Sequence, residues 1–344
     1  MPKNMKKILI LYTGGTVGMD YTANGLQVVS GLFESQLKSL APVANAELSL
    51  IEYDKLIDSS DIGLVDWVKI IKDITKHYDE YDGFVVVHGT DTMAYTASML
   101  AFALRGLSKP VILTGAQLPL VHRRSDGWFN LIDAIYAAMQ SDLNEVAIAF
   151  NHKLLRGCRS QKISTNRFSG FDSVDREPLA EFGIDILWHK KHWLKASRYA
   201  FSPVIPRDIK VLDLSLRPGY TTQFIADTLL TTDAVAVVLQ TYGSGTIPMG
   251  NKHLVDAMTQ ATKRGVMIVS VTQVREGKIS NQYLNSELSQ FGVISGSDMT
   301  PEATIAKLWV LFSSNMSRQG IATAMKTSLI GELTDDAESR GKYT

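Results

Sequence analysis

Three short segments place hydroxyl groups, glycines and one carboxylate directly after runs of apolar residues. They are Thr13-Gly14-Gly15-Thr16, Gly89-Thr90-Asp91-Thr92 and Thr114-Gly115-Ala116-Gln117. Because glycine lacks a Cβ atom, a substrate can approach the backbone of the first segment, where N–H groups and a threonine hydroxyl face the same space. Donors of this kind stabilise the negative charge that develops on an attacked carbonyl group. Together the segments are candidates for a polar site that acts on a carbonyl compound.

Two of these segments also have an ordinary structural interpretation. A glycine pair after a strand is common in phosphate-binding turns, although residues 14–18 match neither the Gly-x-Gly-x-x-Gly fingerprint nor a loop that ends in Gly-Lys-Ser/Thr. Thr90 and Asp91 stand where a helix is expected to begin, and their side-chain oxygens could simply cap its backbone. Taken alone, neither segment distinguishes catalysis from these roles.

Buried parallel strands are expected to position the three segments. Runs of Val, Ile and Leu recur without alternation, which is typical of strands covered on both faces, and stretches with helical spacing lie between several of them. The predicted strands are Ile8–Tyr12, Phe84–His88, Val111–Thr114, Val146–Phe150, Val211–Leu214, Ala234–Leu239 and Val266–Thr272, and the predicted helices include Leu64–His77, Met93–Leu104, Asn130–Gln140 and Leu254–Lys263. This order predicts an α/β fold with mainly parallel sheets, in which ligands bind beyond the carboxyl ends of the strands.

The length of 344 residues is enough for two domains, each with its own core. The alternation of strands and helices stops at the basic and aromatic stretch 188–193 and at Pro203 and Pro206. We therefore expect a larger N-terminal α/β domain over residues 1–190, a linker over 191–208 and a smaller C-terminal α/β domain over 209–344.

Composition excludes several classes of protein. The chain is 45% hydrophobic and 20% charged, which is too apolar for an intrinsically disordered protein. Lys plus Arg and Asp plus Glu number 35 each, so no basic excess is present to neutralise nucleic-acid phosphates. No apolar run approaches the roughly 20 residues of a membrane helix. We expect no nucleic-acid partner, no membrane association and a cytoplasmic protein.

Metal and cysteine chemistry have little support in the sequence. The seven histidines show no metal-ligand spacing, so no metal is expected. The single cysteine, Cys158, allows no intramolecular disulfide, which suits a reducing compartment. It has no histidine partner in a recognisable hydrolase signature, and we expect a buried or incidental thiol.

Six short motifs are spread along the chain. They are Thr13-Gly14-Gly15-Thr16-Val17-Gly18, Asp58-Ser59-Ser60, His88-Gly89-Thr90-Asp91-Thr92, Thr114-Gly115-Ala116-Gln117, Arg124-Ser125-Asp126-Gly127 and Tyr242-Gly243-Ser244-Gly245. Together they resemble the bacterial-type L-asparaginases, and among these the cytoplasmic type I enzymes, over nearly the whole chain. The resemblance implies two α/β domains, with the catalytic groups on the N-terminal one, and hydrolysis of L-asparagine to L-aspartate and ammonia. It also implies that no metal or organic cofactor is needed and that the protein is a homodimer or homotetramer.

The resemblance assigns roles to particular residues. Thr16 resembles the nucleophile, and Thr90, Asp91 and Lys162 resemble the residues that support it. The residues that match the family's substrate-binding positions are Gly15, Asp58, Ser59, Ser60, Thr90, Asp91 and Ala116. Without the resemblance, Lys162 would be assigned to an exposed face, because three cations fall within residues 156–162.

Amide hydrolysis sets chemical requirements for these residues. It needs a nucleophile, a site for the oxyanion and a proton for the leaving ammonia. The amine of Lys162 can take a proton only while it is neutral, and we expect it to form a hydrogen bond with the Thr90 hydroxyl as a proton relay. Asp91 is a plausible partner for the substrate ammonium group, and the hydroxyls of Ser59 and Ser60 are candidates to hold its carboxylate.

One loop near the expected nucleophile departs from the type I pattern. Residues 19–28, with the turn signal Asn24-Gly25, are either a lid that closes over the site or a plain surface loop. Relatives often carry a tyrosine directly after the loop glycine, whereas Leu26 occupies that position here. Tyr21 is therefore the candidate lid residue.

A second departure concerns regulation. Some type I relatives sense asparagine at a second site through an arginine and a cysteine, and this chain has Gln240 and Val274 at those positions. Because the bidentate clamp of an arginine is missing, we expect simple saturation kinetics. Thr246 likewise replaces an asparagine that relatives commonly carry near a subunit contact.

Three functions stay open at this point. The first is hydrolysis of L-asparagine through an acyl ester on Thr16. The second keeps the fold but acts on glutamine, or in the amide step of a transfer-RNA amidotransferase, because one methylene changes binding by only about 1–3 kcal/mol. The third is a non-catalytic amino-acid or nucleotide-binding module, which would not need two threonine hydroxyls and a lysine together.

Overall fold

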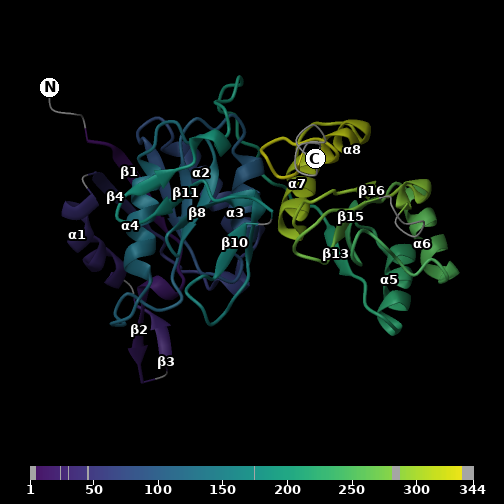
Figure 1. Cartoon of the computed structure of the whole chain (residues 1–344), viewed down its shortest axis with the longest axis horizontal. Coiled ribbons are helices and arrows are strands. Elements are labelled where there is room, and N and C mark those ends of the chain that lie inside the picture. The colour runs from purple at the N-terminus through teal and green to yellow at the C-terminus, as the bar shows by residue number, and fades with distance from the viewer. Residues whose placement is uncertain are drawn as a thin grey trace. The chain divides into compact units, whose positions relative to one another are not determined.

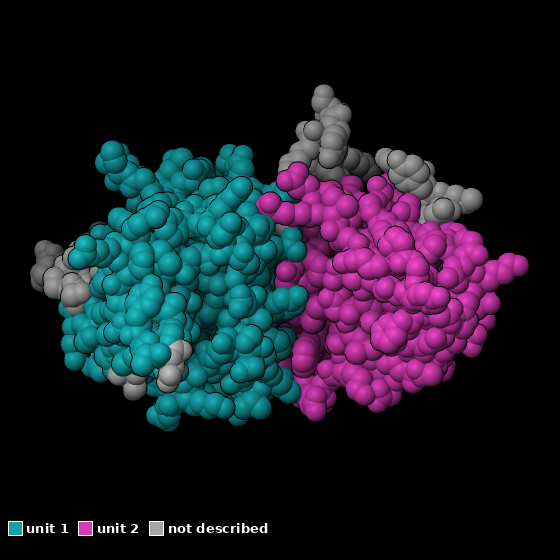
Figure 2. Space-filling model, turned by 90° about the horizontal axis from the view of Figure 1, so that it is seen from below, with its two compact units in different colours: residues 1–205 teal, residues 206–344 magenta. Residues whose placement is uncertain are grey.

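The chain forms two compact units. The computed structural model describes residues 5–23, 25–29, 31–44, 46–173, 175–280 and 287–334, with the backbone alone for 39–44. Unit 1 comprises residues 1–205 and unit 2 residues 206–344 (Figure 2). Both are α/β units with mainly parallel sheets, which confirms the fold class predicted from the sequence. Asn24, part of the predicted turn, lies outside the described residues.

Unit 1 is built on an eight-stranded sheet with the order β12-β11-β8-β7-β6-β5-β1-β4. The strands from β7 to β4 are parallel, and β8, β11 and β12 extend the sheet through antiparallel pairs. The strands are β1 (Lys7–Tyr12), β4 (Glu47–Glu52), β5 (Gly83–Val87), β6 (Val111–Thr114), β7 (Val146–Phe150), β8 (Lys153–Arg156), β11 (Ala180–Phe182) and β12 (Ile186–Trp188). Two separate hairpins pair β2 (Met19–Thr22) with β3 (Gly25–Val28) and β9 (Ser160–Lys162) with β10 (Phe171–Ser173).

Helices cover both faces of this sheet (Figure 1). They are α1 (Leu32–Ala44), α2 (Leu64–Lys76), α3 (Met93–Ala103) and α4 (Gly127–Ala138). Ile8, Ile10 and Tyr12 of β1 share one core cluster with residues of α1 and α4. The alternate residues Leu9 and Leu11 are equally buried, and α3 packs on β6 and β7. Burial on both faces explains why the sequence of β1 is apolar without interruption.

The strands predicted in residues 8–12, 84–88, 111–114 and 146–150 are confirmed by β1, β5, β6 and β7. Strand β4 was not predicted, since polar and apolar residues alternate in Glu47-Leu48-Ser49-Leu50-Ile51-Glu52. It lies at the edge of the sheet, where its residues are only partly buried, and an edge strand of this kind tolerates polar side chains.

The segment after β12 packs on unit 1. Trp193 is in the core of this unit and donates a hydrogen bond from its ring nitrogen to the Leu179 carbonyl, 3.0 Å away. Further along, the N–H of Ser202 donates to the Arg105 carbonyl, and the Phe201 ring stacks on Tyr78 with 3.6 Å between centroids. The two units divide between residues 205 and 206, within the segment 191–208 that was predicted as the linker.

Unit 2 has a four-stranded parallel sheet of order β13-β14-β15-β16. Its elements are β13 (Val211–Ser215), α5 (Tyr220–Thr231), β14 (Ala236–Thr241), α6 (Lys252–Lys263), β15 (Met267–Thr272), β16 (Ile294–Ser295), α7 (Pro301–Ser313) and α8 (Arg318–Met325). Residues of α5 and α6 form one core cluster with the sheet, and residues of α7 and α8 form another. A fully buried ion pair of Lys307 with Glu332 ties the segment after α8 to α7. Across the described residues, no helix is long and apolar enough to span a membrane.

Candidate active site

Adjacent strands bring the first two polar segments into contact. Strands β1, β5 and β6 are neighbours in the sheet, so the segments that follow them leave its same edge. Gly14 and Gly15 both adopt positive φ angles, of 134° and 92°. A Cβ atom on Gly15 would lie 2.5 Å from the Gly89 nitrogen, and one on Gly14 would lie 2.3 Å from the Ile57 oxygen. Only glycine permits this approach, which sets Thr16 beside the loop of Thr90.

The predicted substrate-binding segment packs against the same loop. Ser59 is buried, and its hydroxyl accepts a hydrogen bond from the Asp91 N–H at 3.3 Å. Its carbonyl accepts another from the Thr92 hydroxyl at 2.6 Å. The hydroxyl of Ser59 therefore keeps its own proton available to a carboxylate. Residues 58–60 are thus part of one cluster with the second polar segment, although they lie more than 30 positions before Asp91 in the sequence.

Asp58 is an exposed carboxylate held by its neighbour. Its Oδ1 atom accepts hydrogen bonds from both the N–H and the hydroxyl of Ser60, each at 2.9 Å. These two bonds favour the charged form and lower the pKa of Asp58 below its ordinary value. The group can therefore meet a substrate ammonium as a carboxylate.

Lys162 joins this cluster from a distant part of the chain. Its amine donates to the Thr90 hydroxyl oxygen at 2.8 Å and lies 2.5 Å from Asp91 Oδ1. The hydrogen bond predicted between Lys162 and Thr90 is thus present. The lysine side chain is 18% exposed, whereas that of Asp91 is 63% exposed, so the carboxylate faces solvent while the amine is largely covered. Because Thr90 accepts from the amine, its own hydroxyl proton is free to be donated elsewhere.

His88 lies beneath this cluster in a hydrogen-bonded chain. Its Nδ1 is 2.6 Å from the Gly89 carbonyl, which can only accept, so Nδ1 carries the proton. Its Nε2 then accepts from the Thr96 hydroxyl at 3.0 Å, and that hydroxyl in turn accepts from the Trp67 ring nitrogen at 3.0 Å. Complete burial lowers the pKa of His88 to about 4, against smaller opposing effects of the Gly89 carbonyl and Asp66. The imidazole is therefore neutral and fixes the carbonyl before Thr90.

This burial predicts a pH dependence of stability. In the unfolded chain the His88 pKa returns to its ordinary 6.5, so the unfolded state binds the extra proton between about pH 6.5 and 4. We expect its contribution to the free energy of unfolding to fall by up to about 3 kcal/mol as the pH drops through this range. Urea titrations at pH 7.5 and 5 would measure the effect. His88→Asn should flatten the dependence, whereas His253→Asn, at a partly exposed histidine, should not. An equal slope in wild type and His88→Asn would contradict the assignment.

Ala116 and Tyr21 occupy contrasting environments. Ala116 is 1% exposed, with its side chain in the core of unit 1. Tyr21 is 59% exposed on the β2–β3 hairpin, which extends from one end of unit 1 (Figure 1). Its ring faces His122, with 6.5 Å between centroids. The roles of Tyr21 as a lid residue and of Ala116 in substrate binding remain predictions.

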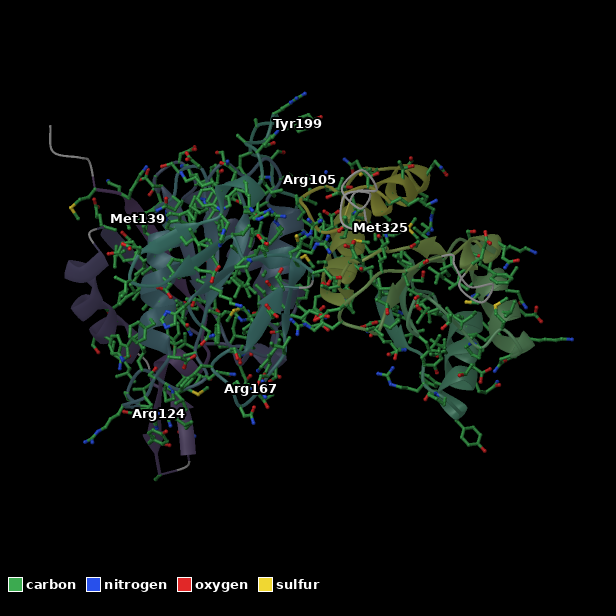
Figure 3. The ribbon with its side chains drawn as sticks, viewed as in Figure 1. Arg105, Arg124, Met139, Arg167, Tyr199 and Met325 are labelled. Carbon is green, nitrogen blue, oxygen red and sulfur yellow. The ribbon has the colours of Figure 1, made fainter. Side chains whose placement is uncertain are left out.

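Two arginines stand at the same end of unit 1 as this hairpin. Figure 3 shows the side chains of Arg124 and Arg167 pointing outwards there. The guanidinium of Arg124 lies 5.9 Å from the centroid of the Phe168 ring.

Within the described ranges, no group of three or more His, Cys, Asp and Glu residues could hold a metal ion. Cys158 is buried, as expected.

Several residues around the cluster were not predicted from the sequence. His88 carried no signal beyond its place in a motif, because its partners Thr96 and Trp67 come from two different helices. Asp126 and Asn130 contact the third polar segment, as described below, and their spacing of four residues at a helix start is a signal that could have linked them.

Known proteins share both the fold and the sequence. Residues 7–194 match the family model "Asparaginase, N-terminal", and residues 210–325 match "Glutaminase/Asparaginase C-terminal domain". The chain is 40% identical over 340 residues to L-asparaginase 1 of Escherichia coli K12, a match that covers 96% of this chain and 99% of that protein. The crystal structure of L-asparaginase I from Vibrio cholerae is similar with a TM-score of 0.86 and 40% identity, covering 96% of this chain and all of that one. The thermostable L-asparaginase from Thermococcus kodakarensis is similar with a TM-score of 0.86 at 30% identity and the same coverage.

Proposed function

The chain belongs to the asparaginase family, and we propose that it hydrolyses L-asparagine to L-aspartate and ammonia through an ester on Thr16. The observation that carries this proposal is the Lys162 amine held between the Thr90 hydroxyl and Asp91, at the strand ends where Thr16 also stands. The substrate is inferred from the names of the relatives, and the hydroxyl, amine and carboxylate of this cluster are groups that amide hydrolysis can use.

The reaction has two steps. In the first, the Thr16 hydroxyl oxygen attacks the carboxamide carbon, and the relay of Thr90 and Lys162 accepts its proton. The C–N bond then breaks, and ammonia departs with a proton that Thr90 donates and that Lys162 restores through its hydrogen bond to Thr90. In the second step, water attacks the ester, releases L-aspartate and returns the proton to Thr16. Asp91 orients the amine of Lys162 throughout.

Binding of the amino-acid ends would use the remaining polar groups. Asp58 and Asp91 are exposed carboxylates that can pair with the substrate ammonium. The free hydroxyl proton of Ser59 can reach the substrate carboxylate, whereas the hydroxyl proton of Ser60 is already donated to Asp58. The N–H groups beside Gly15 suit the oxyanion, and Ala116 supplies peptide groups for the carboxamide. Tyr21 on the β2–β3 hairpin is the proposed lid residue.

Ammonia release from L-asparagine and L-glutamine by the purified protein tests the function. We expect rapid release from asparagine and at least tenfold slower release from glutamine. Preference for glutamine would favour a glutaminase of the same fold. No release from either amide, together with measurable binding of asparagine, would favour a non-catalytic binding protein and reject the proposal.

The kinetics should lack positive cooperativity. Gln240, which stands where some relatives have arginine, donates from Nε2 to both oxygens of Asp213, at 2.9 and 2.8 Å. A second asparagine would therefore bring its carboxylate towards another carboxylate. Burial raises the pKa of Asp213, and hydrogen bonds from Gln240 oppose that shift. We expect a hyperbolic dependence of rate on asparagine concentration, and a sigmoidal curve in wild type would contradict this assignment.

We also propose a homodimer or homotetramer in the cytoplasm. Both statements rest on the resemblance to the type I enzymes, together with the single cysteine of the chain.

A further inference from the structure

The third polar segment is held from one side by the start of α4. Asn130 donates both hydrogens of its side-chain amide, one to the Gly115 carbonyl at 2.9 Å and one to Asp126 Oδ2 at 3.0 Å. Its Oδ1 atom accepts from the N–H of Asn151 at 2.9 Å. The carboxylate of Asp126 also accepts from the N–H groups of Gln117 and Leu118, each at 3.0 Å. Asn130 is 1% exposed and Asp126 is buried as well, so these bonds compete little with water.

This arrangement fixes the peptide groups of Ala116. In a trans peptide the C=O and N–H point in opposite directions. The carbonyl of Gly115 points to Asn130, so the N–H of Ala116 points away from α4. The N–H of Gln117 points to Asp126, so the carbonyl of Ala116 points away as well. Neither group of Ala116 has a hydrogen-bond partner in the described part of the chain, although the residue is almost fully buried.

An unpaired buried peptide group is rare in proteins, and it indicates a partner that is absent from the protein chain itself. The carboxamide of a bound substrate has the donors and the acceptor that Ala116 lacks. The frame of Asp126 and Asn130 therefore turns the peptide groups of Ala116 towards a ligand.

The side chain of Gln117 extends the same frame to Lys162. Its amide nitrogen donates to the carbonyls of Ser164 and Arg167, at 3.2 and 2.9 Å. These residues belong to the loop that follows Lys162 and leads from β9 to β10. The side chain of Arg167 points outwards (Figure 3), and its backbone is what faces Gln117. Asp126 thus fixes the N–H of Gln117, and the side chain of Gln117 is bonded to the loop that follows Lys162.

We propose that Asp126, Asn130 and Gln117 are positioning residues of the reaction: a hydrogen-bonded frame that sets the Ala116 peptide groups and Lys162 at fixed positions relative to each other. The proposal rests on the proposed function and adds residues to it that need not touch the substrate. Asp126 of the Arg124-Ser125-Asp126-Gly127 motif then has a role in the reaction in addition to its position at the start of α4.

Gln117→Glu is the first test. The substitution keeps the shape of the side chain but turns two donors into acceptors that face two carbonyls. Because Gln117 is only partly buried, the protein should fold. We expect kcat for asparagine to fall about 10- to 100-fold, with KM changed less than about threefold. Gln140→Glu is the matched control, because Gln140 donates in the same way to the Tyr136 carbonyl at 3.2 Å, at the far end of α4. It should leave both constants unchanged.

Asp126→Asn tests the other half of the frame. The new amide places donors against the N–H of Gln117, so the peptide groups of Ala116 tilt. KM should therefore rise at least tenfold, while the melting temperature of the variant stays within a few degrees of wild type.

Wild-type activity in the same assay tests the proposed function by itself. With an active wild type, unchanged kcat in folded Gln117→Glu and unchanged KM in folded Asp126→Asn would overturn the frame. With an inactive wild type, calorimetric binding of L-asparagine replaces the assay: at least tenfold weaker binding to Asp126→Asn supports the frame and equal binding overturns it.

Discussion

Thr16→Ala is expected to lower kcat for asparagine by about 10⁴-fold or more and to leave the fold intact. Removal of the nucleophile of a covalent mechanism abolishes both steps, and losses of this order accompany such changes in other hydrolases. Thr16 is only partly buried at the start of a short 3₁₀ helix, so loss of its hydroxyl leaves no unpaired buried group. Ammonia release under saturating asparagine measures the change.

Two further variants make this result specific to the hydroxyl. Thr16→Ser keeps the nucleophile and should retain activity within about 100-fold of wild type, because only a methyl group is lost. Thr75→Ala removes a threonine hydroxyl of α2 that donates to the Ile71 carbonyl, and it should leave the rate unchanged. Rapid quenching of the wild type followed by mass spectrometry should find the aspartyl ester on the peptide that contains Thr16. A Thr16→Ala protein with near-normal turnover would remove Thr16 as the nucleophile.

Lys162→Met is expected to lower kcat by about 10³-fold with a much smaller change in KM. The methionine side chain fills a similar volume, but it leaves Thr90 without the donor at 2.8 Å and Asp91 without its cation. Proton transfer by a positioned group contributes roughly 10²- to 10⁴-fold to a rate, and loss of the relay should remove most of this contribution. Steady-state kinetics over a range of asparagine concentrations separate the two constants.

Lys190→Met is the matched control for this variant. Lys190 forms an ion pair with Asp142 at 2.9 Å in the same unit, on the segment after β12, and exposed pairs of this kind contribute little to stability. It should behave as wild type in the ammonia assay. Full activity of Lys162→Met would show that Thr90 works without the lysine, and the proton relay would have to be abandoned.

Close contacts between loops leave no room for a side chain at two glycines of the site. A Cβ atom on Gly115 would lie 2.4 Å from the His88 carbonyl oxygen, and one on Gly89 would lie 2.6 Å from the Ser59 hydroxyl oxygen. Both contacts join loops from different strands. Any side chain at these positions would separate the polar segments that the reaction needs together.

The sequence by itself determined the central strands and the chemical character of their ends. Strands β1, β5, β6 and β7 are continuous apolar runs, and each is short enough for its local pattern to specify it. The hydroxyls, glycines and carboxylate that follow β1, β5 and β6 are adjacent in sequence to those strands. Their convergence follows from parallel pairing of the strands, so the apolar runs and the residues after them were enough to predict it.

Only the tertiary structure decided which distant residues reach this edge. Lys162 lies 72 positions from Thr90, in a segment whose charge pattern suggests an exposed face, and it meets Thr90 because the β9–β10 hairpin folds back over the strand ends. The hydrogen bonds of Gln117 to the loop after Lys162, and those that link His88 with Thr96 and Trp67, likewise join separate elements that only the fold brings together. Local apolar patterns specify strands and helices, whereas contacts between separate loops depend on the packing of the whole sheet and on the lengths of its connections. For that reason the sequence indicated the kind of site, and the fold selected the residues that complete it.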